Sequence, residues 1–206
     1  MMNIRLTLLS LCCLFILGSC NSGQIKEVEG TGEYEGFVMS PIPNTNSFVA
    51  EKRDAGLNVI ENGIIKDGKK DGPWMTYYTD ERGHIKTLTN YIDGVKNGVS
   101  IAFNSRGQVE KREAFINNQL HGTAAVYKLG RPSTATEYKY GQFHGKHIEY
   151  YQAGGIQKLV EFKNGKQDGI LRYFDEEGKI TLEYEYKDGE KVSGGIIENE
   201  ENSSEN

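Results

Sequence analysis

An internal repeat constrains this chain more than any other feature of its sequence. One unit recurs five times with a partial sixth, at a period of 23 to 26 residues. Each unit opens with a short turn pair, at Asp67-Gly68, Asp93-Gly94, Asn117-Asn118, Tyr140-Gly141, Asn164-Gly165 and Asp188-Gly189. Most of these are Asx-Gly pairs, which readily supply the positive φ angles that tight hairpins need. The repeat therefore predicts a succession of β-hairpins.

Two rows of large side chains recur within the units. The first row stands three residues before each opening turn, at Ile65, Tyr91, Phe115, Tyr138, Phe162 and Tyr186. The second row follows a second glycine in each unit, at Tyr77, Phe103, Tyr127, Tyr150 and Phe174. The flanking residues alternate between apolar and polar, which is the period of two typical of strands. We expect both rows on one face of a sheet, opposite a mostly polar face that includes Ser100 and Glu149.

These patterns predict an all-β fold, namely an antiparallel β-hairpin repeat array that forms an elongated single sheet or an open half-barrel. No stretch after residue 19 shows a helical apolar period, so almost no helix is expected. We assign residues 64–194 to the repeat domain and residues 34–63 to an N-terminal capping segment. The polar, acidic residues 195–206 are expected to be a disordered tail.

The first 19 residues have the layout of a secretory signal peptide. Arg5 precedes an apolar run of about 12 residues, which is short of the roughly 20 that a transmembrane helix needs. Leu17-Gly18-Ser19-Cys20 resembles the lipobox of bacterial lipoproteins, which implies lipidation at Cys20 and a lipid-anchored tether over residues 20–33. The alternative is an ordinary signal peptide cut near Ser19. Asn21 in place of Asp favours the outer membrane within the cell envelope.

The repeats resemble the MORN-repeat variant of bacterial proteins. The stretches that carry the resemblance are Tyr91-Ile-Asp-Gly-Val-Lys-Asn-Gly98, Phe162-Lys-Asn-Gly-Lys-Gln-Asp-Gly169 and the His-Gly pairs at His121 and His144. The resemblance implies a role in protein contacts or membrane-proximal scaffolding, or that of an antitoxin or immunity protein. Asn118, the Leu129-Gly130 turn with Pro132, and Ser193 depart from the motif. These departures put the regularity of the third and sixth units in question.

The sequence offers little that points to catalysis, a metal or a cofactor. Removal of Arg5 with the signal takes the formal charge from −5 to about −6, with basic and acidic residues interleaved, which argues against nucleic-acid binding. His144 and His147 fall in one hairpin and His121 in the turn one unit earlier, about 10 Å away at roughly 4.8 Å per strand, which is too far for a shared zinc ion. Carboxylate clusters such as Asp80-Glu81 lie beside turns, where solvation is their usual role. We therefore predict no enzymatic activity, no catalytic residues, no metal and no cofactor.

Aromatic residues outside the two rows are the remaining candidates for a binding site. Exposed tyrosine and tryptophan side chains are typical of protein interfaces. The candidate partner-binding residues, which we expect to form an exposed apolar patch, are Trp74, Tyr78, Tyr140, Phe143, Tyr151 and Tyr173. The sequence thus predicts a lipid-anchored envelope protein that acts as a non-enzymatic protein-binding or scaffolding module. The alternatives are an antitoxin or immunity protein that neutralises a toxin, and a surface carbohydrate or adhesion binder.

Overall fold

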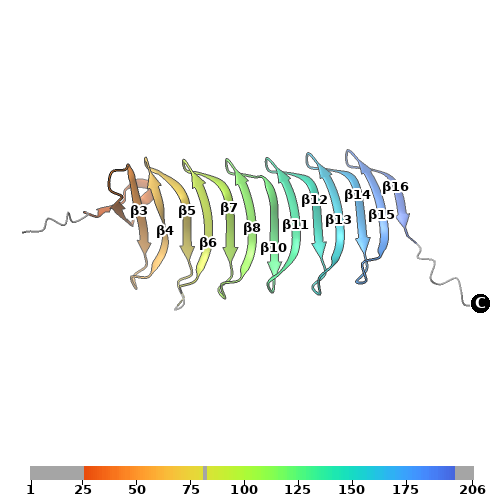
Figure 1. Ribbon diagram of the computed structural model, residues 1–206, viewed down its shortest axis with the longest axis horizontal. Coiled ribbons are helices and arrows are strands. Elements are labelled where there is room, and N and C mark those ends of the chain that lie inside the picture. The colour runs from red at the N-terminus through yellow and green to blue at the C-terminus, as the bar shows by residue number, and fades with distance from the viewer. Residues whose placement is uncertain (1–25, 81–82, 198–206) are drawn as a thin grey trace, which may run out of the picture.

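The described part of the chain is a single antiparallel sheet, drawn out along one axis (Figure 1). The computed structural model describes residues 26–80 and 83–197. Its elements are β1 (Val28–Glu29), the 3-10 turn η1 (Gly32–Tyr34), β2 (Phe37–Pro41), β3 (Ser47–Arg53), β4 (Val59–Lys66), β5 (Lys69–Tyr77), β6 (Ile85–Ile92), β7 (Val95–Phe103), β8 (Val109–Ile116), β9 (Gln119–Leu120), β10 (Gly122–Lys128), β11 (Arg131–Lys139), β12 (Gln142–Tyr150), β13 (Ile156–Lys163), β14 (Lys166–Phe174), β15 (Ile180–Lys187) and β16 (Glu190–Ile196).

The strand order follows the chain order from β1 to β16, with the short β9 pairing only with β8. In Figure 1 the labelled strands β3 to β16 run in this order along the long axis, so the sheet does not close on itself. The prediction of an open, all-β hairpin array is confirmed. No helix within the described residues has the length and apolar character needed to cross a membrane.

The opening turns join the strands in the way that their sequences predict. Both central residues of each turn have a positive φ, such as 48° at Asp67 and 77° at Gly68, and Lys66 stands opposite Lys69. Each later turn also reaches back to the unit before it. The backbone N–H of Gly94, for example, donates to the carbonyl of Lys70 at 2.9 Å. The turns therefore both close their own hairpins and tie successive units together.

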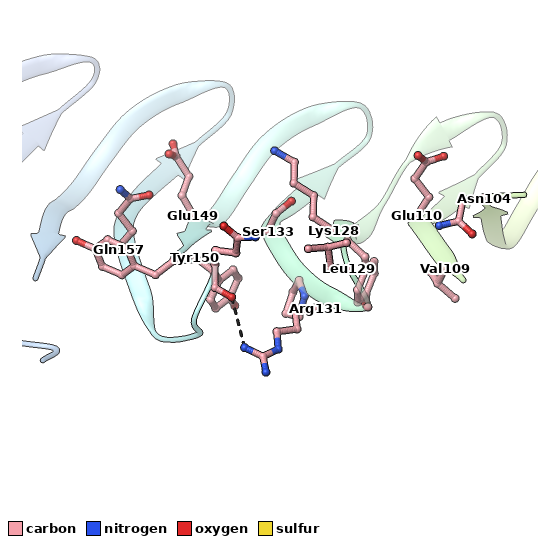
Figure 2. Close-up of a pocket in the computed structure, with 15 residues that line it drawn as sticks. Asn104, Val109, Glu110, Lys128, Leu129, Arg131, Ser133, Glu149, Tyr150 and Gln157 are labelled. Atoms are coloured by element: carbon pink, nitrogen blue, oxygen red, sulfur yellow. Dashed lines mark hydrogen bonds between the residues drawn. The ribbon is translucent and has the colours of Figure 1, made fainter. Parts of the chain in front are cut away.

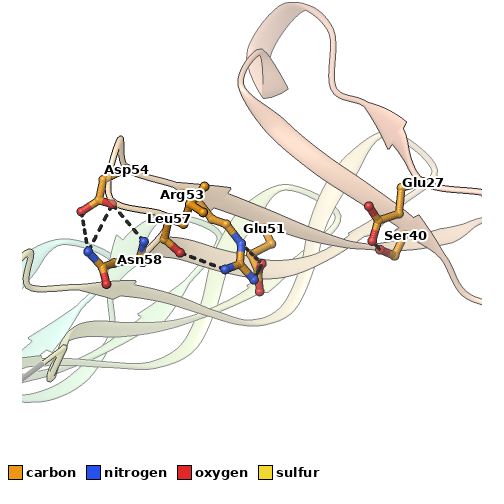
Figure 3. Close-up of polar contacts among 7 residues, drawn as sticks. All are labelled: Glu27, Ser40, Glu51, Arg53, Asp54, Leu57 and Asn58. Atoms are coloured by element: carbon orange, nitrogen blue, oxygen red, sulfur yellow. Dashed lines mark hydrogen bonds and ion pairs between the residues drawn. The ribbon is translucent and has the colours of Figure 1, made fainter.

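Longer loops join most strands at the opposite edge of the sheet. In one of them, Asp54 Oδ1 accepts a hydrogen bond from the backbone N–H of Asn58 at 2.9 Å (Figure 3) and another from that of Gly56, also at 2.9 Å. Asn104 uses its side-chain oxygen in the same way in the loop between β7 and β8. A side-chain oxygen thus replaces the backbone partners that a tight turn would supply.

The main hydrophobic cluster lies at the N-terminal end of the sheet. It consists of Phe37, Ala50, Ile65 and Trp74, with Tyr34 packed against it. A Cβ atom on Gly63 would lie 2.1 Å from the Trp74 ring, so the absence of a side chain there makes room for the indole. The segment predicted to cap the repeats supplies β2, β3 and most of β4, and its border with the repeats falls inside β4.

Two predicted boundaries need correction. Val28 and Glu29 of the predicted tether pair with β2, because an extended backbone beside an unpaired strand gains hydrogen bonds even where its side chains are polar. At the other end, β16 continues to Ile196, two residues into the predicted tail, through pairing with Leu182. The predicted signal (1–19), Cys20 and the tail from residue 198 lie outside the described residues.

The prediction that both aromatic rows share one face is wrong. Tyr91 lies on the same face as Thr89 and Trp74, whereas Tyr77 lies with Met75 on the other face. The reason is the two-residue turn. Residues that pair across such a hairpin are an odd number of positions apart in the sequence, and their side chains point to the same face. Each first-row residue and the second-row residue of its unit are an even number of positions apart, so they point to opposite faces. The two rows therefore lie on opposite faces of the sheet and do not form one core.

Candidate functional site

The third repeat unit interrupts the regular edge of the sheet. Loops of five residues join β7 to β8, β12 to β13 and β14 to β15, whereas β10 and β11 are joined by Leu129 and Gly130 alone. Lys128 and Arg131 pair directly across this turn. The short hairpin therefore recedes between its longer neighbours, and the irregularity that the sequence suggested for the third unit is present.

A change of side chains in the second aromatic row widens this opening. In the other units, the row aromatic stands opposite a branched aliphatic residue, as Phe103 stands opposite Val109 and Tyr150 opposite Ile156. Tyr127 instead stands opposite Pro132, which is exposed. Pro132 on β11 leaves open the space that an isoleucine side chain would fill there, because the proline ring is smaller and is bonded back to the backbone nitrogen.

The result is a notch of about 640 Å³ across units two, three and four (Figure 2). It is lined by Asn104, Val109, Glu110, Tyr127, Lys128, Leu129, Gly130, Arg131, Pro132, Ser133, Glu149, Tyr150, Tyr151, Gln152 and Gln157. In Figure 2, Glu110, Lys128 and Glu149 project to one side of the notch and Arg131 to the other. The lining combines three tyrosines with a majority of polar and charged side chains, and a concave site of this size is large enough to hold part of a ligand or partner.

Leu129 is the most unusual residue of the notch. Its φ is 51°, a left-handed conformation that leucine rarely adopts, and its side chain is 74% exposed. Such a conformation costs an L-residue about 1–2 kcal/mol, and Asn or Gly would adopt it more readily. The fold gains little from this leucine, because its side chain has few neighbours. Strain of this kind is concentrated at functional sites.

Charged groups hold the walls of the notch in place. The Arg131 guanidinium donates to the carbonyl oxygen of Gln152 at 3.4 Å (Figure 2) and to that of Ala153 at 3.0 Å, which ties the short hairpin to the next loop. Glu149 lies 3.2 Å from Lys158 Nζ and 3.4 Å from His147 Nε2. Partial burial raises the pKa of Glu149, but the hydrogen bond and charge of Lys158, with a contribution from His147, outweigh it and hold that pKa below its usual range. Glu149 is therefore ionised at neutral pH.

Three of the predicted partner-binding residues have structural roles. Trp74 is only 3% exposed and packs against Phe37, with 5.9 Å between the ring centroids, so its predicted place in an exposed patch is wrong. The hydroxyl of Tyr78 donates to the Phe103 carbonyl at 2.8 Å. The hydroxyl of Tyr151 donates to the carbonyl of Phe174 at 2.6 Å. Both tyrosines thus connect successive units, and Tyr151 also lines the notch.

The other three predicted residues do not form a common surface with them. Phe143 is half-buried and packs edge-on against Tyr138 and Phe162, each at 5.1 Å between ring centroids. Tyr140 is 57% exposed in the turn between β11 and β12, where it contacts His121. Tyr173 is 39% exposed on β14. The single patch predicted from the six residues is therefore absent, because they lie on different strands, faces and edges.

The site that the structure brings together was missed in the sequence, although a signal for it was present. Tyr127 and Tyr150 belong to the regular row and were expected to be structural. The departure at Leu129-Gly130-Pro132 marked the right unit, because a leucine in a two-residue turn is unfavourable and the connection from Tyr127 to Pro132 is one residue shorter than that from Phe103 to Val109. His121 and His144, also in the repeats, are half-buried, and His144 Nδ1 accepts a hydrogen bond from the N–H of Asn164 at 3.4 Å. Among the described residues, no group of three or more His, Cys, Asp or Glu is placed to hold a metal ion.

Comparison with known proteins gives weak similarity to two long bacterial proteins. The chain is 26% identical over 159 residues to the tRNA3(Ser)-specific nuclease WapA of Bacillus spizizenii and 26% identical over 145 residues to the tRNA nuclease WapA of Bacillus subtilis. The matches cover 68% and 62% of this chain but only 6% of each relative. No family model matches the chain. A solved GtfA/B complex is similar over 77% of this chain and 21% of its own, at 11% identity and a TM-score of 0.18.

These relatives correct one prediction made from the sequence. We predicted that the chain has no enzymatic activity, and both curated relatives carry the name of a tRNA nuclease. The prediction rested on the absence of recognisable catalytic motifs, which does not exclude activity in a protein related to named enzymes. The chain spans only 6% of the length of these relatives, so their activity is a hypothesis to be tested for this chain.

Proposed function

We propose that this protein is a lipid-anchored binding module of the cell envelope, whose MORN-like hairpin array presents the notch of the third unit to a partner protein. The observation that carries the proposal is Leu129, a strained and exposed leucine at the mouth of a cavity lined by Tyr127, Tyr150 and Arg131. Tyrosine and arginine are enriched where protein interfaces bind most tightly.

The architecture supports a binding role in a second way. Arg131 is fixed by carbonyls of the neighbouring loop, and Tyr151 is fixed by its bond to the Phe174 carbonyl. Side chains that are already ordered lose little entropy when a partner binds. The notch is therefore organised before binding, and Leu129 is free to enter an apolar pocket of the partner.

Lipid anchoring rests on the sequence around Cys20. The proposal predicts that the mature chain sediments with membranes and is released only by detergent. Substitution Cys20→Ser should move the protein to the soluble fraction of the envelope. Labelling with an alkyne fatty acid provides the second readout, since it should fail with the same variant. Retention of the label in the Cys20→Ser variant would refute lipidation at this residue.

Affinity capture tests the partner. The tagged full-length chain is purified from detergent-solubilised envelope of its own host, and co-purifying proteins are identified by mass spectrometry. We expect one protein to be enriched with the wild type and lost with the double variant Leu129→Asn, Tyr150→Ala. The matched control is Tyr140→Asn, which changes an exposed, strained residue at the other end of β11. Equal capture by all three proteins would place the binding site outside the notch.

The similarity to WapA proteins favours a second candidate, an antitoxin or immunity role toward a nuclease-type toxin. The purified chain is incubated with total tRNA, alone and together with a candidate toxin encoded beside its gene. Protection of tRNA from the toxin would support the immunity role. Cleavage of tRNA by the chain alone would assign a nuclease activity to it instead, and would replace the binding-module proposal as the primary function.

A further inference from the structure

The two ends of the sheet are built differently. At the N-terminal end, β1 is only two residues long, and the chain then folds back so that Tyr34 contacts Phe37 edge-on at 6.1 Å between ring centroids. The backbone N–H of Gly30 donates to the Phe37 carbonyl at 2.8 Å. A short strand and a covering turn are the usual protection of a sheet edge. This end offers little backbone to another strand.

The C-terminal end lacks such protection. β16 has seven residues, and within the described residues it pairs with β15 alone. Its apolar side chains are open to solvent, with Val192 62% and Ile196 79% exposed. A strand of this length leaves a row of backbone N–H and C=O groups without strand partners, which another strand can use.

Two polar side chains of β16 contact the neighbouring strand instead of projecting along this edge. The Lys191 ammonium lies 3.8 Å from the centroid of the Tyr184 ring, so it folds back over the face of the sheet. Ser193 Oγ donates to the carboxylate of Glu185 at 3.1 Å, on the neighbouring strand. Apart from the exposed Glu190 at the start of β16, the edge thus presents backbone and aliphatic side chains.

We propose that two copies of this chain associate through β16, antiparallel and edge to edge, so that the two sheets become one. Pairing centred on Gly194 would place Val192 of each copy opposite Ile196 of the other. Ile196 lies on the face that holds Leu182, its partner on β15, whereas Val192 is the extra residue of a β-bulge between Lys191, opposite Tyr186, and Ser193, opposite Glu185. These aliphatic side chains, both open to solvent in the single chain, would then contact each other across the junction.

The protected N-terminal end decides the form of the assembly. Head-to-tail pairing of β16 with the opposite end of another copy would need a free strand there, and β1 with its covering turn does not supply one. Among the described residues, β16 is therefore the edge that is open to pairing, so the contact is made by the same surface on both copies. Such a contact closes at a dimer and does not grow into a filament.

Native mass spectrometry of the purified full-length chain, released from detergent, counts the copies directly. We expect a dimer whose fraction rises with protein concentration, because one strand pair is a small interface. The double variant Val192→Lys, Ile196→Lys brings like charges into opposition and should weaken dimerisation at least about tenfold. The control Ile92→Lys changes an aliphatic residue that is 47% exposed at the end of β6, away from β16, and should dimerise like the wild type.

Three results would overturn the proposal. These are a wild type that is monomeric at every concentration, a double variant that dimerises as well as the wild type, and wild-type masses that continue beyond the dimer. Circular dichroism and the urea unfolding midpoint of each variant confirm that the sheet is intact. Partner capture through the notch does not involve β16, so failure of one proposal is distinguishable from failure of the other.

Discussion

Substitution Leu129→Asn should stabilise the fold and weaken binding at the notch at the same time. Leu129 has a φ of 51° and precedes Gly130 at 77°, which is the geometry of a two-residue hairpin turn that favours Asn-Gly. Asparagine adopts this conformation with less strain, so the substitution relieves about 1 kcal/mol of the cost. Five of the six opening turns of the repeat already place Asp or Asn at the first position.

The loss of apolar contact is smaller than this gain. Complete burial of a leucine side chain contributes about 1.5–3 kcal/mol. Because Leu129 is 74% exposed, only about a quarter of that contribution, roughly 0.5 kcal/mol, is lost with the side chain. The variant should therefore be about 0.5 kcal/mol more stable than the wild type. With a typical urea dependence, the unfolding midpoint should rise by roughly 0.2–0.5 M.

The assay is urea unfolding followed by circular dichroism, with partner capture measured on the same preparations. Asn164→Leu is the reciprocal control, because it places leucine at the same kind of position, at a φ of 51°, in a turn outside the notch. That variant should lose about 1 kcal/mol and keep the partner. A lower midpoint for Leu129→Asn would show that the leucine stabilises the fold, and the inference from strain to function would fail. A higher midpoint with unchanged capture would separate the strain from binding.

Three further predictions concern the sheet itself. Gly63→Ala should destabilise the protein by about 1–3 kcal/mol in urea unfolding, because its methyl group would overlap the Trp74 ring; no change would mean that the indole moves freely. Tyr151→Phe should cost about 1 kcal/mol through loss of the hydrogen bond to the Phe174 carbonyl, and an unaltered midpoint would refute this link between units. Hydrogen bonds from the Asp188 N–H and from Lys187 lower the pKa of Asp168, so its stabilising effect is present above the ordinary carboxyl pKa of about 4 and is lost as pH falls through the lower folded-state value. Asp168→Asn should therefore show a smaller loss of unfolding midpoint between neutral and acid pH than the wild type, and an identical loss would contradict this assignment.

The sequence by itself determined the features that depend on neighbouring residues. Asp67-Gly68 and its equivalents specify two-residue turns, because few other residues accept two positive φ angles in succession. Alternation over residues such as Ile180 and Leu182 specifies strands, and equal spacing of the turns specifies an open array. The departure at Leu129-Gly130-Pro132 even identified the irregular unit. Local conformational preferences are sufficient for each of these conclusions.

The tertiary structure alone decided how side chains from different strands meet. Trp74 looked like an exposed aromatic, yet it is buried because Gly63 and Phe37, on β4 and β2, provide space and contact for its ring. Tyr151 looked free, yet it bonds to a carbonyl of the next unit. The notch exists because a short hairpin lies between two longer loops. Burial and cavities depend on the register between strands that are distant in sequence. A repeat motif specifies the strands and turns of one unit, but it does not specify the contacts or cavities between neighbouring units.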